Sequence, residues 1–248
     1  MALAGLIVLV PVVLVTSFLS GIFGMAGGML LLWFLFLVAP ASTAIAVHGI
    51  IQLVSNGSRA WFSRAYLDYK ILAFVVAGLM VATIILFSVY YTPNAAIASI
   101  VIGLLPLLLW IPASKLTIDA SRPSHAFACG FIAGGLTITV GISGPTIDMF
   151  FIRTHLDRRV VIATKATIQV VAHFAKIVFY WTAAMALDLT GWTAILISLP
   201  VAVLGAWLGK FVLHRMSDVQ FRSWTRLLVT AIGFTYLVQG AFALAAPQ

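Results

Sequence analysis

The sequence predicts an all-α, multi-span membrane protein built from two inverted-topology repeats. Of the 248 residues, 63% are hydrophobic and only 8% are charged, against roughly 25% charged in a typical soluble domain. Two long apolar stretches are interrupted by glycine clusters. The basic residues fall in connections that can all lie on the same side of the membrane. A helix needs about 20 apolar residues to cross a bilayer, so the chain has room for about eight to ten crossings and no separate soluble domain.

Composition excludes several classes of function. The chain has no glutamate and six acidic residues in all, which argues against carboxylate-rich metal cages, and we expect neither a metal nor a cofactor. A single cysteine, Cys129, excludes an internal disulfide and a thiolate zinc site. The net charge of +8 comes from short connections rather than from a basic stripe. We therefore interpret it as a topology signal and expect no nucleic-acid partner.

Eight apolar stretches define the expected membrane segments. Six are expected to be plain helices. The first is broken by glycines between Gly21 and Gly28, and the fifth by Gly141 to Pro145. The N-terminal stretch is apolar from Ala2 onward, so we expect it to be a mature segment rather than a signal peptide. Broken backbone at membrane depth is tolerated only where it is buried in protein or lines a cavity. The stretches cover 3–38, 42–62, 71–91, 94–112, 125–152, 158–185, 191–213 and 221–245.

The connections set the orientation. Those at 39–42, 92–94 and 186–190 contain no lysine or arginine, whereas basic residues in short loops stay in the cytoplasm. This pattern requires each broken segment to enter and leave on one face, as a hairpin followed by three crossings, with both termini outside the cytoplasm. The predicted cytoplasmic residues are Arg64, Lys70, Lys115, Arg122, Arg153, Arg158, Arg159, Lys210, Arg215, Arg222 and Arg226.

The two halves also align in sequence. The predicted units are a first repeat at 1–112, a cytoplasmic connection at 113–124 and an inverted second repeat at 125–248. At a fixed offset of 117, Gln52 falls on Gln169 and Asn56 on His173. Aligned polar residues inside two spans are harder to obtain by accident than apolar matches. The other equivalent positions are Gly24 to Gly27 with Gly141 to Gly144, His48 with Lys165, and Arg59 with Lys176.

Polar stripes on the second and sixth segments indicate a site at the bilayer midplane. His48, Gln52 and Asn56 recur at i, i+4 and i+8, as do Lys165, Gln169 and His173, so each set shares one helical face. Both glutamines lie about ten residues inside their segments, or about 15 Å. Each stripe is therefore expected to face protein or water at mid-depth.

Broken helices that meet at this depth point free N–H groups and positive dipole ends at an anionic group. The nearby cations would match the charge of a small oxyanion, the amides would orient it, and hydroxyl groups would add donors. We predict a secondary transporter whose partners are a small anion, protons and the lipid bilayer. The predicted substrate site comprises Gly24, Gly27, Gly28, His48, Gln52, Asn56, Gly141, Ser143, Gly144, Thr146, Lys165, Gln169 and His173.

Simpler interpretations stay open for several of these residues. Glycine clusters also permit close helix packing, and single histidines or amides also serve as hydrogen-bond links between helices. Arg59 and Lys176 lie toward segment ends and are expected to snorkel to the interface. Lys165, about six residues from an end, fits either a site or a snorkelling role.

Asp148 is the candidate for proton coupling. It lies among apolar residues of the broken fifth segment, and an intramembrane carboxylate is a functional candidate by default. An anion that competes for its cationic partner would leave Asp148 more inclined to bind a proton, so that anion and proton bind together. The alternative is a structural counter-ion for Arg153 or Lys165.

The glycine motifs resemble those of the TauE/SafE sulfite exporter family. The resemblance rests on Phe18 to Leu32 and a weaker copy from Phe131 to Pro145, and it extends over essentially the whole chain. It implies transport of sulfite, a sulfonate or a related organosulfur anion across the bacterial inner membrane. This chain has Ala26 where such proteins commonly have a third consecutive glycine, and Trp33 where a proline is common, which leaves the particular substrate open.

Other classes of function compete with transport. Gly141-Ile-Ser-Gly144 matches the GxSG motif of rhomboid intramembrane proteases, with Ser143 as nucleophile and His173 as base. The repeat explains the same glycines without a nucleophile, because the first half has Ala26 at the position equivalent to Ser143. An anion channel and a purely structural membrane component are further alternatives, and neither explains two midplane glutamines related by inversion.

Overall fold

The computed structural model describes residues 3–112, 115 and 117–245, and every regular element in these residues is a helix. Four of them are long and apolar enough to cross a membrane. They are α4 (Tyr69–Ser88), α8 (Arg158–Phe179), α10 (Leu189–Arg215) and most of α11 (Asp218–Ala245). The others are α1 (Leu3–Phe23), α2 (Met25–Val38), α3 (Ala41–Ser63), η1 (Arg64–Tyr66), α5 (Ala95–Leu104), η2 (Leu105–Trp110), α6 (Pro123–Thr139), α7 (Gly144–Phe151) and α9 (Trp181–Met185).

Short polar residues begin several of these helices. The side chain of Asp68 accepts a hydrogen bond from the backbone N–H of Ile71 at 2.9 Å and caps α4. Asn94, Asp157 and Asp188 cap α5, α8 and α10 in the same way. Such caps satisfy backbone donors that a helix start leaves unpaired. Three of the six acidic residues in the chain thus have a structural role at a helix start.

Two stretches expected to be plain helices are interrupted. The stretch 94–112 changes from α5 to the 3-10 helix η2 at Leu105, where Pro106 has no backbone N–H to continue the α-helical ladder. The stretch 158–185 is divided at Tyr180, whose φ of −99° and ψ of 25° separate α8 from α9. The tyrosine hydroxyl donates to the carbonyl of Ile138 at 2.7 Å, which fixes the bend against α6.

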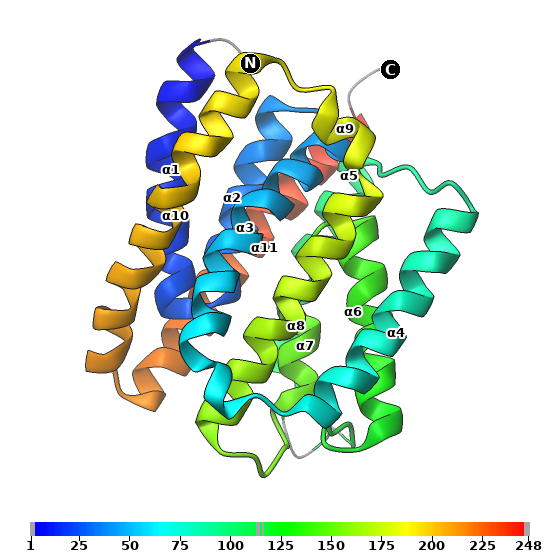
Figure 1. Cartoon of the computed structure of the whole chain (residues 1–248), viewed down its shortest axis with the longest axis vertical. Helices are drawn as coiled ribbons and strands as arrows, with labels where there is room; N and C mark the ends of the chain where they lie inside the picture. Colours follow the sequence, from blue (N-terminus) through cyan, green and yellow to red (C-terminus); the bar gives the residue numbers. More distant parts are fainter. Residues whose placement is uncertain (1–2, 113–114, 116, 246–248) are drawn as a thin grey trace.

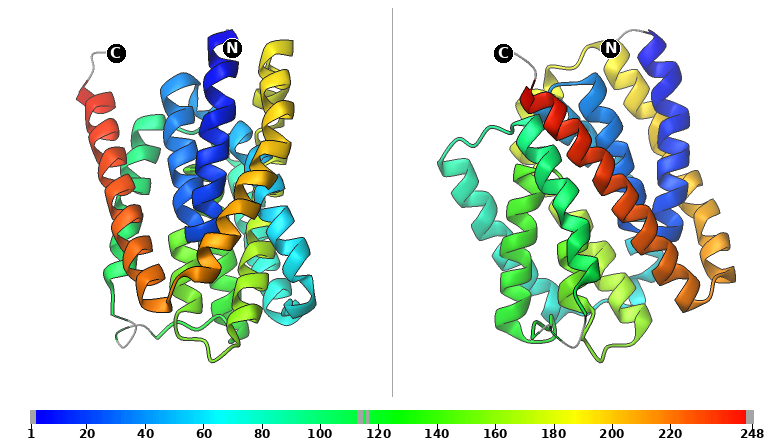
Figure 2. Two further views of the ribbon diagram at one scale, coloured as in Figure 1. Left: turned by 90° about the vertical axis from the view of Figure 1, so that its left-hand side faces the viewer. Right: turned by 180° about the vertical axis from the view of Figure 1, so that it is seen from behind.

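The glycine-broken segments fold as two hairpins. In Figure 1 the start of α1 and the end of α2 lie toward one end of the molecule, whereas the start of α6 and the end of α7 lie toward the other. The start of α1 and the end of α11 share the first end. The α1–α2 turn lies near mid-height of the molecule (Figure 2). Helix breaks at this depth place backbone polar groups inside the protein.

Helix pairs drawn from different parts of the chain build the scaffold. α1 packs along α10, α4 packs along α6, and α3 packs against α8 in the middle. Glycines permit the close approach: a Cβ on Gly21 would lie 2.5 Å from the carbonyl oxygen of Ala206, and a Cβ on Gly130 would overlap that of Val75. Because α3 and α8 meet centrally, their polar stripes are brought together next to both helix breaks.

Candidate functional site

A small polar cavity lies between the two helix breaks and the central helices α3 and α8. Its volume is about 30 Å³, which is room for a water molecule or two. Ten of the thirteen residues predicted for the substrate site line it. Its walls are formed by Gly24, Met25, Gly28, Met29, His48, Gln52, Asn56, Thr137, Gly141, Ile142, Ser143, Gly144, Gln169, Ala172 and His173.

The two breaks share an unusual backbone conformation. Gly24 has a φ of 67° and Gly141 a φ of 88°, and they are the positive-φ glycines among the described residues. Residues with a Cβ atom disfavour a positive φ, whereas glycine adopts it readily. The two positions are 117 residues apart, the offset at which the halves align. Gly24 is the N-cap of α2, and Gly141 lies three residues before the start of α7, so each glycine marks a helix break beside the cavity.

A hydrogen-bonded chain joins the first break to the second. The Nε2–H of His48 donates to the carbonyl of Gly28 at 2.9 Å. Its Nδ1 lies 2.6 Å from the Nζ of Lys176, which also donates to the carbonyl of Gly141 at 2.9 Å. Because a carbonyl only accepts, the first contact assigns the proton to Nε2 and makes Nδ1 the acceptor for Lys176.

The expectation that Lys176 snorkels is wrong. Its side chain has 0% exposure, although it lies near the end of α8. The carbonyl of Gly141 and the ring of His48 offer acceptors inside the protein, so the amine turns inward rather than toward the interface. Lys176 continues the stripe of His173 at i+3, and this spacing is the sequence signal that indicates its position.

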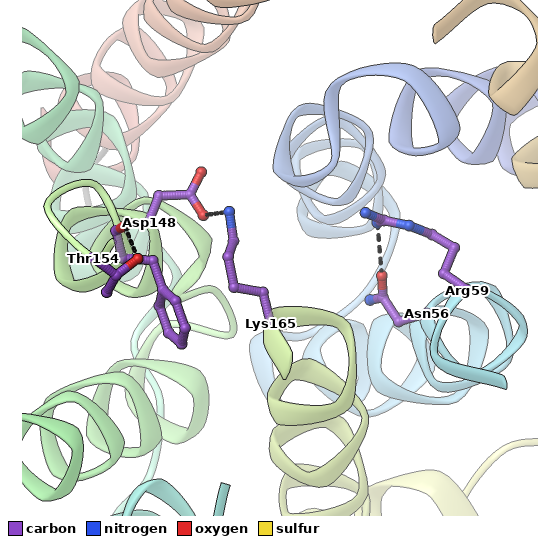
Figure 3. Close-up of polar contacts among 6 residues, drawn as sticks. Asn56, Arg59, Asp148, Thr154 and Lys165 are labelled. Atoms are coloured by element: carbon purple, nitrogen blue, oxygen red, sulfur yellow. Dashed lines mark hydrogen bonds and ion pairs between the residues drawn. The ribbon is translucent and has the colours of Figure 1, made fainter. Parts of the chain in front are cut away.

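A second chain of hydrogen bonds fixes the proton positions on His173. Arg59, a pure donor, donates to the Oδ1 of Asn56 at 3.2 Å (Figure 3), which directs the amide nitrogen of Asn56 to the Nε2 of His173 at 3.0 Å. Nε2 is therefore an acceptor and Nδ1 carries the hydrogen. The Nδ1 atom is buried and has no hydrogen-bond partner. His173, which lines the cavity, thus has a buried donor that lacks an acceptor. Arg59 also departs from the snorkelling expectation, since it turns inward.

Two side-chain amides face the cavity beside glycines. A Cβ on Gly28 would overlap the Nε2 of Gln52, and a Cβ on Gly144 would lie 3.8 Å from the Nε2 of Gln169. Both glycines lie in the first turn of a helix that follows a break. The absence of a side chain there leaves space for each amide to reach the cavity.

Three residues predicted for the substrate site lie elsewhere. Gly27 faces α1, where a Cβ would overlap the carbonyl of Thr16, so its role is close packing. Thr146 is buried with an unpartnered hydroxyl but does not line the cavity. Lys165 forms an ion pair with Asp148 (Figure 3). The helical register explains this, because Lys165 lies on the same stripe of α8 but one turn before Gln169, which lines the cavity.

A larger cavity adjoins the inner one and is named here the vestibule. Its volume is about 420 Å³, and it shares Gly24, Met25 and Gln169 with the inner cavity. Five basic side chains and one carboxylate line it, giving it a positive character. These residues are Arg59, Arg158, Lys165, Lys210, His214 and Asp148. Sequence reasoning missed the vestibule, because its walls come from α1, α2, α3, α7, α8, α10 and α11.

Serine and histidine do not form a catalytic pair in this arrangement. The hydroxyl of Ser143 is hydrogen-bonded to Thr137 at 2.7 Å, and the Nε2 of His173 is bonded to Asn56. A serine nucleophile needs a base within hydrogen-bond reach. The observed contacts therefore do not favour the protease alternative. Among the described residues, no cluster of histidine, cysteine and acidic side chains suits a metal ion.

A polar cavity between broken helices, inside a bundle of apolar helices, is the architecture of a multi-pass membrane transporter. The family model described as sulfite exporter TauE/SafE matches residues 9–236, and the chain belongs to this family of membrane transporters. The resemblance drawn from the glycine motifs is thereby confirmed. Neither a curated protein nor a solved structure matches the chain.

Proposed function

We propose that the protein is a secondary transporter that binds a small organosulfur anion, such as sulfite or a sulfonate, at the inner cavity, which widens to admit it, and carries the anion across the inner membrane. The observation that carries the proposal is the buried, unpartnered Nδ1–H of His173, a residue that lines the cavity. Its burial without an acceptor is costly. A sulfite or sulfonate oxygen would supply that acceptor.

The rest of the cavity lining supports an anion rather than a cation. The amides of Gln52 and Gln169 can both donate, and no aspartate or glutamate lines the cavity. The carbonyls of Gly28 and Gly141 already accept side-chain hydrogen bonds. The polar groups left to a ligand are therefore mainly donors, which suits an oxyanion.

In this transporter the two halves form an inverted repeat, and their movement alternates access to the cavity. The contact between Asn56 and His173 supports this arrangement, because the two residues occupy equivalent positions of the two halves. The packing of α1 along α10 also corresponds to that of α6 along α4 under the same offset. Two such halves can rock against each other around a fixed central site.

Proton coupling is assigned to Asp148 in this proposal. Asp148 and Lys165 are each 27% exposed in the vestibule, where they form an ion pair. An anion that passes through the vestibule competes with Asp148 for Lys165, and a carboxylate that has lost its cation binds a proton more readily. Anion and proton would then move together.

The test compares the two cavity amides with an amide elsewhere in the membrane. Gln52→Ala and Gln169→Ala are each expected to weaken sulfonate binding roughly ten- to a hundredfold, because each removes a donor to a charged ligand. Gln239→Ala on α11, which lines neither cavity, is the matched control. Isothermal titration of the purified protein measures affinity, and uptake into proteoliposomes measures transport. Unchanged affinity in both cavity variants would refute the proposed site.

Ser143→Ala separates transport from proteolysis. We expect a milder loss of binding than for the glutamines, because Ser143 already has a partner in Thr137. Complete loss of all activity in Ser143→Ala, with both glutamine variants unaffected, would favour the protease instead. Accumulation of the anion against its own gradient distinguishes a secondary transporter from an anion channel.

A further inference from the structure

Lys176 is a fully buried basic residue with two acceptors for three N–H groups. Its side chain is 0% exposed. The amine contacts the Nδ1 of His48 and the carbonyl of Gly141, at 2.6 and 2.9 Å. An ammonium group has three N–H donors. The charged form therefore has one more donor than these contacts satisfy.

No carboxylate among the described side chains compensates Lys176. Asp148 pairs with Lys165 in the vestibule. The other described aspartates accept hydrogen bonds from backbone N–H groups at helix starts or turns. These are Asp68 with Ile71, Asp119 with Ser121, Asp157 with Arg159 and Asp188 with Gly191. A positive charge at Lys176 thus lacks a described counter-ion from the protein.

Lys176 lies directly behind the wall of the inner cavity. Both of its partners, His48 and Gly141, line that cavity. His48 also stacks edge-on with His173, with ring centroids 5.7 Å apart. Three basic side chains from α3 and α8 are therefore gathered where two helix breaks meet.

We infer that Lys176 is the counter-charge of the anion bound in the inner cavity, and that it acts through His48 and the Gly141 carbonyl rather than by direct contact. The inference rests on the proposed function. It is distinct from the coupling assigned to Asp148, which lies in the vestibule. Lys176 is in this sense a positioning residue.

The physical reason is that a buried charge and a buried counter-charge stabilise each other. A lone ammonium in the protein interior is costly. An anion in the adjacent cavity lowers that cost, because the attraction between charges is strong where water is excluded. By covering the carbonyls of Gly28 and Gly141, the chain of His48 and Lys176 also removes two groups that would repel an anion.

The experiment separates charge from shape with two probes. Methanesulfonate is an anion, and methanesulfonamide is a neutral molecule of similar shape. Titration calorimetry of the purified full-length protein measures both affinities at neutral pH. Wild-type protein is expected to prefer the anion by about tenfold or more. Lys176→Gln keeps N–H donors but removes the charge, so we expect this preference to fall to about threefold or less, with little change in affinity for the neutral probe.

The control removes a charge that is not buried. Lys70 lies exposed near the start of α4 and lines neither cavity, so Lys70→Gln is expected to keep the wild-type preference. Lys176→Met tests the same loss of charge without an amide. Thermal unfolding identifies the variants that fold.

The outcomes distinguish the inference from the proposal on which it rests. A wild-type preference for the anion that persists in Lys176→Gln or Lys176→Met overturns the counter-charge role alone. Equal loss of affinity for both probes also overturns it, because that result indicates a merely structural lysine. If wild-type protein binds both probes and prefers the anion by less than threefold, that measurement alone overturns the counter-charge role. If it binds neither probe, the proposed substrate site is itself wrong.

Discussion

Gly28→Ala is expected to disable the inner cavity without unfolding the protein. Gly28 is buried in the first turn of α2. An added Cβ would overlap the Nε2 of Gln52 and lie 3.5 Å from the Nε2 of His48. The obstructing atom is the end of a side chain, so the amide can rotate away while the helices stay in place. Alanine also favours a helix over glycine by roughly 0.5–1 kcal/mol, so stability should be unchanged or slightly raised.

The loss of affinity follows from the displaced amide and the lost space. A hydrogen bond to a charged ligand contributes about 1.5–3 kcal/mol, which corresponds to roughly ten- to a hundredfold in affinity. The inner cavity has a volume of only about 30 Å³, so the methyl group also takes much of the available space. We therefore expect Gly28→Ala to weaken sulfonate binding at least as much as Gln52→Ala.

Calorimetry with methanesulfonate and thermal unfolding in detergent measure the two effects separately. Gly57→Ala is the matched control, because Gly57 lies on α3 and a Cβ there meets nothing within 4 Å. The control is expected to bind like wild type. If Gly28→Ala binds methanesulfonate within threefold of wild type and folds normally, the cavity is not where the anion binds.

Three further outcomes are expected. Gly130→Ala places a Cβ against the backbone carbonyl of Val75, so α4 and α6 must separate. Thermal unfolding should show a loss of stability of roughly 1–3 kcal/mol. Gly135→Ala is the control and should show no such loss, because a Cβ there meets open space. Asp148→Asn should abolish accumulation driven by a pH gradient; persistence of that accumulation would return Asp148 to a structural counter-ion. A cysteine introduced near residue 245 should react with an impermeant thiol reagent from outside the cell, and reaction only from the cytoplasm would remove the inverted-repeat argument.

Much of the central site can be predicted from spacing alone. The i, i+4, i+8 stripes place His48, Gln52 and Asn56 on one face of α3, and the structure gathers all three at one cavity. The glycine clusters locate the helix breaks within a few residues, at Gly24 and between α6 and α7. These features depend on local backbone geometry, which the sequence determines directly.

Other features depend on which helices become neighbours. Lys176 lies near a helix end in the sequence, and only the position of His48 and Gly141 opposite it explains its burial. Thr137 joins the cavity because the chain reverses after α6 and brings Ser143 back to it. The pairing of Lys165 with Asp148 similarly depends on how α7 lies against α8. Spacing along α8 places Lys176 on the face of His173, but which helix lies opposite that face leaves no periodic signal in the sequence.

The glycine contacts of α1 with α10 and of α4 with α6 have a consequence for biosynthesis. Gly21 and Gly209 lie against each other, as do Gly78 and the backbone around Phe127. Each close contact joins a helix of the first half to one of the second half, so the narrow faces of α1 and α4 are exposed to lipid until the second half is inserted. In the newly made first half, α1 and α4 therefore lack the helices against which they pack in the complete protein. Its folding is expected to wait for translation of α6 and α10, and a chain truncated after residue 112 should be degraded or aggregate rather than persist as a stable half.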